Sequence, residues 1–242
     1  MPTKGYGECP IDAARARLKR ARKRHASRLG VSPSDVEWQL DINRFNGLHK
    51  DGRELIRGWI ARANEAQSSN KFEAFIYAWI GFNGWANCCC EVEADRVLLD
   101  LMILDAGLAE NFNRLTVEGP NSQATEHFAR LWPIFKVTDL PDLPEYARRN
   151  RPQHRGRAAV VRYYEEHWPN ADRAPNCHMT HAAGIKPDWG HTLEGIYRVR
   201  NNLFHGQKSG AGREDKEIVD AAVDVLLPVA KSVLALSGGQ PG

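Results

Sequence analysis

The sequence predicts an all-α protein, an up-and-down helical bundle with a long irregular insertion before its last two helices. In most long segments apolar residues recur every three or four positions, which is the spacing of one helix face. Alternating strand-like runs bounded by hairpin turns are hard to find. Eight of the 13 prolines fall between Pro120 and Pro187, where they break the helical pattern into short pieces. These observations predict one helical domain interrupted by an insertion.

Composition is that of an ordinary globular chain. Its 242 residues are 42% hydrophobic and 26% charged, and no run of about 18 apolar residues appears. The N-terminal segment has no apolar stretch followed by a cleavage site, so we expect a cytoplasmic protein with no membrane partner. The five cysteines, three of them adjacent at positions 88–90, have no regular spacing that would suggest a disulfide framework.

The helical pattern predicts five core helices and three sequence regions. The core helices are expected at about 52–67, 71–89, 91–114, 191–205 and 214–236. The helix at 71–89 is apolar nearly all round, so it should lie at the centre of the bundle. The regions are a basic arm and docking segment at 1–45, a helical domain at 46–236 with the insertion at about 115–190, and a disordered tail at 237–242. Within the insertion, short helices are expected near 122–131 and 156–168.

Basic residues are unevenly spread along the chain. Between Ala14 and Arg28 there are eight basic residues and no acidic one, on a segment that can form a helix at 11–29 and that ends at Gly30. Such a run suits a polyanion, because each neutralised phosphate releases counterions. The candidate RNA-binding residues are Arg20, Arg22, Lys23, Arg24, Arg148 and Arg149. A solvated, poorly ordered arm is the other interpretation, and the sequence alone leaves both open.

The segment from Arg200 to Gly206 carries the best indication of function. It reads Arg-Asn-Asn-Leu-Phe-His-Gly. On a helix Asn201 and His205 lie four residues apart on one face, and Gly206 suits a helix end. A histidine in the last turn is favoured in its charged form, and an arginine can hold phosphate oxygens with two parallel hydrogen bonds. These groups suit RNA cleavage by 2′-hydroxyl attack, which needs acid-base catalysis and charge stabilisation but no metal.

Other motifs give weaker indications. Residues 177–181, Cys-His-Met-Thr-His, contain soft ligands, but no well-spaced second pair completes a zinc site. No phosphate-binding loop of the Walker type is present, so we expect no metal ion and no cofactor. Most tryptophans have helical core spacing. Within the insertion, Trp132, Trp168 and Trp189 are candidates for stacking on bases.

Two stretches resemble the HEPN superfamily. Ile196 to Gly206, followed by a short loop and a helix, is similar to the HEPN signature, and residues 79–83, Trp-Ile-Gly-Phe-Asn, look like the asparagine-bearing helix of several HEPN groups. The resemblance covers about residues 52–236 with the insertion left aside. It implies a helical homodimer with the motifs of both subunits at the interface, and metal-independent endoribonuclease activity in toxin–antitoxin, antiviral or RNA-processing systems.

The resemblance also implies residue roles. Arg200 would hold the scissile phosphate, Asn201 would be the polar residue after it, and His205 would be the acid or base. Asn83 would orient the motif from a facing helix, or else be a hydrogen-bonded core amide. The expected partners are RNA, a second copy of the chain and an antitoxin or other regulatory protein. The alternative function is a non-catalytic helical module that binds RNA or a partner.

Overall fold

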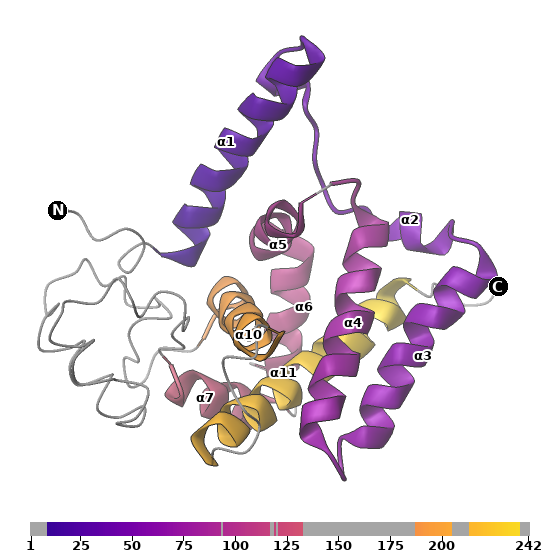
Figure 1. Ribbon diagram of the computed structural model, residues 1–242, viewed down its shortest axis with the longest axis vertical. Helices are drawn as coiled ribbons and strands as arrows, with labels where there is room; N and C mark the ends of the chain where they lie inside the picture. The colour runs from indigo at the N-terminus through magenta and orange to yellow at the C-terminus, as the bar shows by residue number, and fades with distance from the viewer. Residues whose placement is uncertain are drawn as a thin grey trace, which may run out of the picture.

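The computed structural model confirms an all-α fold (Figure 1). It describes residues 9–92, 94–116, 119, 121–132, 187–204 and 213–237, and every regular element in these ranges is helical. No helix among them is both long enough and apolar enough to cross a membrane. The predicted helix at 156–168, Trp168 and residues 238–242 of the predicted tail lie outside the described residues. The prediction that the disordered tail begins at Ser237 was wrong, because Ser237 is the buried last residue of a helix.

A hairpin of two antiparallel helices forms the centre of the bundle. Helix α3 (Lys50–Ala66) is followed by α4 (Lys71–Cys89), whose first turn is capped by the Asn70 side chain accepting the Glu73 N–H. The long helix α11 (Arg213–Ser237) packs along α4 and runs through Pro228 (Figure 1). As predicted, α4 is the central element, with Phe75, Phe82 and Trp85 buried. The Trp85 indole donates to Ser237 Oγ at 2.9 Å, which ties the end of α11 to α4.

The basic segment is a helix packed on the bundle. Helix α1 (Pro10–Leu29) buries Ala14 and Leu18 and lies against α5, while its C-terminal end projects past the other helices (Figure 1). It ends at Gly30 in the left-handed conformation with φ 70°, a backbone that glycine adopts without strain. The segment is therefore not the poorly ordered arm that one interpretation expected. A turn of 3₁₀ helix, η1 (Pro33–Asp35), and α2 (Ile42–Asn46) then lead to α3, with Phe45 fully buried.

The prediction of one helix at 91–114 was wrong. The chain forms α5 (Asp95–Leu104) and then α6 (Ala106–Thr116), separated by Asp105 in an extended conformation with ψ 121°. The Asp105 side chain accepts the Leu108 N–H at 2.8 Å, which satisfies a free donor of the new first turn. A short aspartate side chain competes in this way with helix continuation, so the helix restarts there in a new direction.

The ends of the predicted insertion are helical and buried. Helix α7 (Ser122–Arg130) matches the first predicted short helix, and α10 (Trp189–Phe204) starts two residues earlier than expected. Trp132 and Trp189 are only 5% and 1% exposed, and the Trp189 indole donates to the Met102 carbonyl. Their expected role in stacking on bases is therefore wrong, because the helical core already covers both rings.

Close approach between α3 and α4 depends on Gly81. A Cβ built on Gly81 would lie 2.5 Å from Ile60 Cδ1 and 2.8 Å from Ile60 Cγ1, and Ile60 is buried between the two helices. Gly58 on α3 has no atom within 4 Å of such a Cβ. The two glycines therefore form a matched pair, one required by packing and one not.

We predict that Gly81→Ala lowers the free energy of unfolding by about 1 to 3 kcal/mol, because overpacking outweighs the better helix propensity of alanine. Gly58→Ala should leave the protein unchanged or more stable by about 1 kcal/mol. Urea unfolding of both variants measures the difference. Equal stability of the two variants would show that α3 and α4 do not pack this closely.

Candidate functional site

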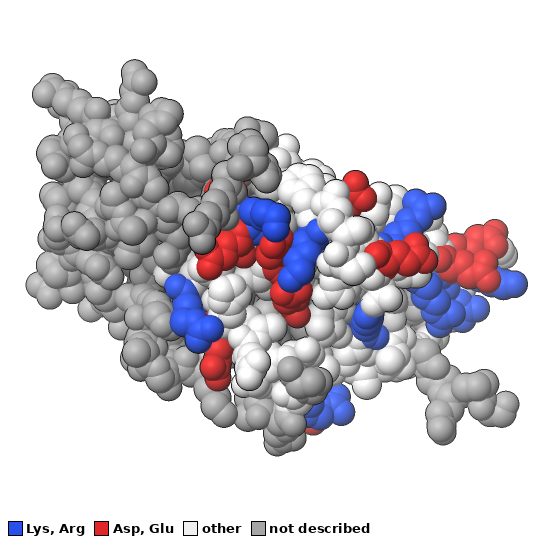
Figure 2. All heavy atoms as spheres, turned by 90° about the horizontal axis from the view of Figure 1, so that it is seen from below, with Lys and Arg blue, Asp and Glu red and all other residues white. Residues whose placement is uncertain are grey.

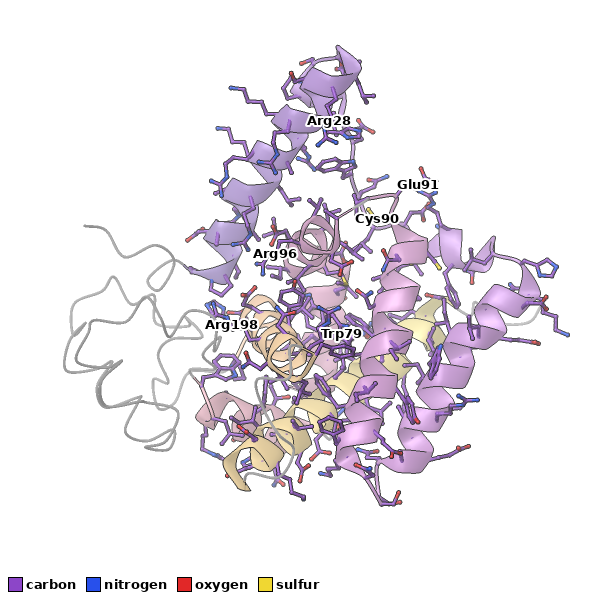
Figure 3. The ribbon with its side chains drawn as sticks, in the orientation of Figure 1. Arg28, Trp79, Cys90, Glu91, Arg96 and Arg198 are labelled. Atoms are coloured by element: carbon purple, nitrogen blue, oxygen red, sulfur yellow. The ribbon has the colours of Figure 1, made fainter. Side chains whose placement is uncertain are left out.

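Arg200 lies in the last turn of α10, against a group of aromatic rings. Its guanidinium carbon is 5.0 Å from the centre of the Phe204 ring, 5.8 Å from Trp79 and 6.0 Å from Tyr197. Trp79 reaches this place from α4, between α4 and α10 (Figure 3). The Arg200 Nη1 donates to Asn201 Oδ1 at 2.9 Å. The rings and the neighbouring amide therefore hold the guanidinium in one position.

The charge of Arg200 is weakly compensated. Its ion pair within the described residues joins Nη2 to Asp95 Oδ2 at 3.9 Å, and the Asp95 side chain is 60% exposed. A long pair with a solvated carboxylate is screened by water and contributes little. The Nε of Arg200 is buried and has no hydrogen-bond partner among the described residues. The Arg200 side chain is 24% exposed, so an incoming anion can reach part of it.

Nearby, two buried carboxylates are shared among three other arginines. The Asp100 side chain is 1% exposed and receives three Arg17 hydrogen bonds: Nε to Oδ2 at 2.8 Å, Nη2 to Oδ1 at 2.8 Å and Nε to Oδ1 at 3.2 Å. Arg96 bridges both acids, donating to Asp100 Oδ1 at 3.1 Å and to Glu194 Oε2 at 2.8 Å. Arg198 completes the network by donating to Glu194 Oε1 at 3.2 Å. We call these five residues the buried ion network.

The buried ion network joins three helices that are distant in sequence. Arg17 comes from α1, Asp100 and Arg96 from α5, and Glu194 and Arg198 from α10. Figure 3 shows Arg198 on the side of α10 that is away from Trp79, and Arg96 beside α5. Burial would lower the pKa of the Arg96 guanidinium, but attraction and hydrogen bonding to Glu194, with the charge of Asp100, raise it overall. Arg96 therefore stays charged and holds the two carboxylates of the network together.

Tyr197 connects the network to the motif. Arg96 lies over the Tyr197 ring at 5.5 Å, and Arg200 lies 6.0 Å from the centre of the same ring. Tyr197 also packs on Trp79 with their centroids 6.0 Å apart. Because the network fixes the rotation of α10 about its axis, it also fixes where Arg200 and Asn201 project.

The other motif residues are only partly placed. His205, Arg148 and Arg149 lie outside the described residues. Asn83 is half-buried on α4 and forms no hydrogen bond with Arg200 or Asn201 within the described ranges; its own carbonyl accepts the Asn87 amide at 2.9 Å. The structure therefore brings Arg200 and Asn201 together.

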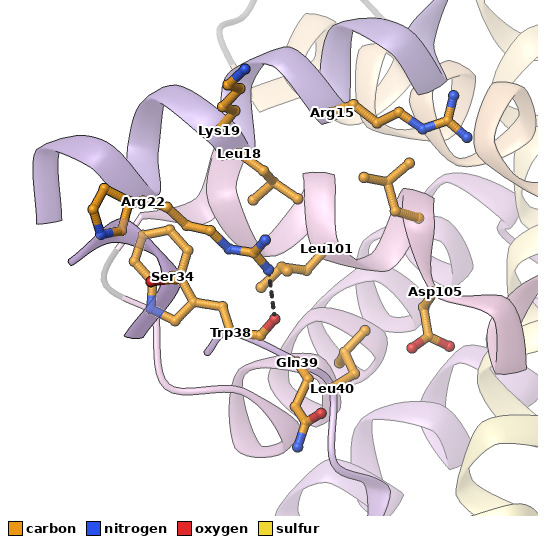
Figure 4. A pocket seen from close by; sticks show the side chains of 12 residues that line it. Arg15, Leu18, Lys19, Arg22, Ser34, Trp38, Gln39, Leu40, Leu101 and Asp105 are labelled. Carbon is orange, nitrogen blue, oxygen red and sulfur yellow. Dashed lines mark hydrogen bonds between the residues drawn. The ribbon is translucent and has the colours of Figure 1, made fainter. Parts of the chain in front are cut away.

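The basic residues of α1 divide between surface and groove. Arg20, Lys23 and Arg24 are exposed, as expected for residues that contact a polyanion. Arg22 instead turns toward the segment after η1 and donates to the Trp38 carbonyl at 3.3 Å (Figure 4). Its Nε is buried without a hydrogen-bond partner in the described structure. Arg22 thus lines the wall of a groove. The run of basic residues in the sequence could not show this position.

This groove has a basic rim and an apolar floor. It holds about 630 Å³ between α1, the segment that carries Trp38 and Leu40, and α5. Arg15 and Lys19 stand on α1 at its edge, and Leu101 lines it from α5 (Figure 4). By contrast, the face opposite the projecting end of α1 carries acidic and basic side chains intermixed (Figure 2). On α1, by contrast, Arg20, Lys23 and Arg24 are exposed within a run of residues that contains no acidic side chain from Ala13 to Leu29.

Several residues around Arg200 have no signal in the linear motif. Phe204 is 51% exposed beside Arg200. Trp79, Tyr197 and Asp95 complete the surroundings from three helices. Two of the ion pairs in the network join residues four positions apart on one helix, namely Arg96 with Asp100 and Glu194 with Arg198. This spacing is the sign of these ion pairs that the sequence offers.

No group of three or more His, Cys, Asp or Glu side chains within the described ranges is arranged to hold a metal ion. Neither a family model, a curated protein nor a solved structure matches this chain.

We predict that Asp100→Asn lowers the free energy of unfolding by about 3 to 5 kcal/mol, because Arg17 and Arg96 lose a buried charged partner. The matched control is Asp12→Asn, which removes an ion pair to Arg15 whose side chains are 63% and 66% exposed. That control should change stability by less than about 1 kcal/mol. Urea unfolding of both variants compares the two, and an equally small effect at Asp100 would refute a structural role for the network.

Proposed function

We propose that this chain is a cytoplasmic, metal-independent endoribonuclease of the HEPN type, acting as a homodimer through Arg200, Asn201 and His205. The observation that carries the proposal is the state of Arg200. Its guanidinium is positioned by three aromatic rings and an amide, and among the described residues it has no close, buried carboxylate. A positioned and weakly compensated guanidinium suits a phosphate.

A comparison of Arg200 with the three arginines of the buried ion network supports this assignment. Arg17, Arg96 and Arg198 each donate to a carboxylate that is at least 95% buried. Arg200 lies next to them, yet its ion pair is longer and its acid is solvated. Exposed Phe204 adds a ring face beside the guanidinium, on which an unpaired base can stack. Together these features fit single-stranded RNA.

The chemistry assigns a part to each motif residue. Arg200 holds a phosphate oxygen and stabilises the charge that develops on phosphorus as the 2′-oxygen attacks. His205 transfers a proton, either from the 2′-hydroxyl or to the departing 5′-oxygen, as the bond from phosphorus to that oxygen breaks. Asn201 fixes the orientation of the guanidinium through its 2.9 Å hydrogen bond.

A second chain supplies the missing proton-transfer group. The motif contains one histidine, whereas cleavage uses both an acid and a base. A symmetric dimer places two copies of a surface against each other, so two His205 side chains can share one cleft. We propose that this homodimer is the active form, and that an antitoxin or another regulatory protein controls it.

Loss of the Arg200 charge should abolish cleavage without unfolding the chain. We predict that Arg200→Ala and His205→Ala each reduce cleavage of single-stranded RNA by about 100-fold or more in the presence of a chelator. Arg200→Lys should remain strongly impaired, because lysine lacks the planar fork. Arg57→Ala, at an exposed position of α3, is the charge-matched control and should cleave normally. Full activity of Arg200→Ala, or dependence on a divalent ion, would refute the mechanism.

A non-catalytic module that binds RNA through α1 is the second candidate function. It is supported by the exposed positions of Arg20, Lys23 and Arg24 and by the intermixed charge on the opposite face (Figure 2). Deleting α1 cannot test it cleanly, since Leu18 is buried in the core and Arg17 pairs with Asp100. Charge substitutions on the exposed side of α1 avoid that difficulty.

We predict that the triple variant Arg20→Ala, Lys23→Ala, Arg24→Ala binds single-stranded RNA more weakly, with a salt slope of log K smaller by about 2, from about 0.7 per lost phosphate contact. The control triple variant carries Lys50→Ala, Arg57→Ala and Arg62→Ala on exposed α3 positions and should keep the original slope. Fluorescence anisotropy at several salt concentrations gives both slopes. If the variant binds RNA more weakly but still cleaves saturating RNA, α1 is an RNA contact of the enzyme. If the original chain itself cleaves no RNA, the non-catalytic binding module is the better description.

A further inference from the structure

A cysteine, a histidine and an aspartate meet where α1 and α10 begin, away from the Arg200 motif. Cys9 is the residue before the first turn of α1, and its Sγ lies 3.6 Å from His191 Nε2. His191 Nδ1 lies 2.6 Å from Asp188 Oδ2. These contacts join residues 182 positions apart in the sequence. A thiol, an imidazole and a carboxylate in this order form the arrangement of an activated nucleophile, its base and the group that orients the base.

The carboxylate is fixed by a bond of its own. Asp188 Oδ1 accepts the backbone N–H of His191 at 2.9 Å, which caps the start of α10 and leaves Oδ2 for the imidazole. With the Nδ1 proton donated to Asp188, the free electron pair of Nε2 faces the Cys9 sulfur. His191 is 2% exposed and its ring stacks on Trp132 at 6.4 Å, so the imidazole has little freedom to turn.

The thiol is reachable. Cys9 is partly exposed, unlike Cys89 and Cys90 at the end of α4. It stands at the N-terminus of α1, a 20-residue helix. The Asp188 side chain is 36% exposed, so water reaches the outer end of this group.

We propose that Cys9 is a nucleophilic thiol that exchanges with small disulfides, with His191 as its base and Asp188 as the residue that positions the base. Cys9 Sγ attacks one sulfur of the disulfide, a new S–S bond forms, and the S–S bond of the small molecule breaks. The thiol proton passes to His191 Nε2 and then to the departing sulfur. The products are a mixed disulfide at Cys9 and one free thiol, so no further oxidant is needed.

The other described cysteines provide internal references. Burial, followed by the neighbouring charges of Cys88 and Asp41, raises the pKa of the Cys89 thiol to about 12, and burial also raises the pKa of Cys88. At pH 7 these sulfurs remain almost entirely protonated and should react slowly. Cys88 is partly exposed like Cys9, which makes it the better match.

The test treats the full folded chain with glutathione disulfide at pH 7 and follows each cysteine peptide by mass spectrometry. Cys9 should form its mixed disulfide at least tenfold faster than Cys88, and His191→Gln should slow Cys9 by tenfold or more. Asp188→Asn keeps an oxygen for the α10 cap but loses the charge, so it should also slow Cys9 in a protein whose unfolding curve is unchanged. This variant carries the test if His191→Gln does not fold.

A second probe separates base catalysis from mere accessibility, because a thiol that is only accessible should react at a rate that neither His191→Gln nor Asp188→Asn changes. Iodoacetamide serves as a second probe of the same thiol. Cys9 rates equal to Cys88, or unchanged by both substitutions, would overturn the proposal, and alkylation without reaction toward glutathione disulfide would overturn the assignment to disulfides.

Discussion

Two buried carboxylates constrain this bundle more than any other polar feature that the described residues contain. Asp100 and Glu194 are almost fully covered, and removing charged groups from water is tolerated only when partners compensate them. Three arginines from three helices provide that compensation. The arrangement specifies how α1, α5 and α10 fit together, since a rotation of any one helix would leave a buried charge unpaired.

This constraint explains how a helix end can present a functional side chain. On helix α10, Glu194 and Arg198 both form ion pairs within the buried ion network. Tyr197 lies between Arg96 and Arg200. Arg200 is therefore held by neighbours that are themselves fixed, although its own acid is distant and solvated. The same placement of α10 sets its first turn, where Asp188 and His191 meet Cys9 at the start of α1. Both candidate chemical groups thus depend on one junction of helices.

Periodicity alone predicted most of the helices, because apolar side chains spaced by three and four residues must share a buried face. It placed α4 at the centre, and the glycine at position 30 predicted the end of α1. It missed the break at Asp105, where a side-chain hydrogen bond to Leu108 decides the path of the chain. Nor does it indicate that the ring of Phe204, an apolar residue at the end of α10, is half exposed. A local side-chain hydrogen bond, or a position at the edge of the core, does not change the three- and four-residue spacing of apolar side chains. Periodicity therefore cannot predict either feature.

The site was less predictable than the fold. Arg200 and Asn201 stood out in the sequence, but the partners that define their surroundings come from α4 and α5. Arg17 and Asp100 are 83 positions apart, and no pattern in the sequence indicates that two charged residues so far apart form an ion pair. Likewise, the sequence shows Arg22 as one of several basic residues, whereas the structure turns it against the Trp38 carbonyl.

Arg200 serves function in this description, whereas its neighbouring arginines serve stability. Urea unfolding of Arg200→Ala beside Arg96→Ala distinguishes the two roles. We expect the free energy of unfolding of Arg96→Ala to fall by about 3 kcal/mol, because two buried carboxylates each lose a partner, and that of Arg200→Ala to stay within about 1 kcal/mol of the original chain. A loss at Arg200 as large as the loss at Arg96 would instead make Arg200 another structural cation.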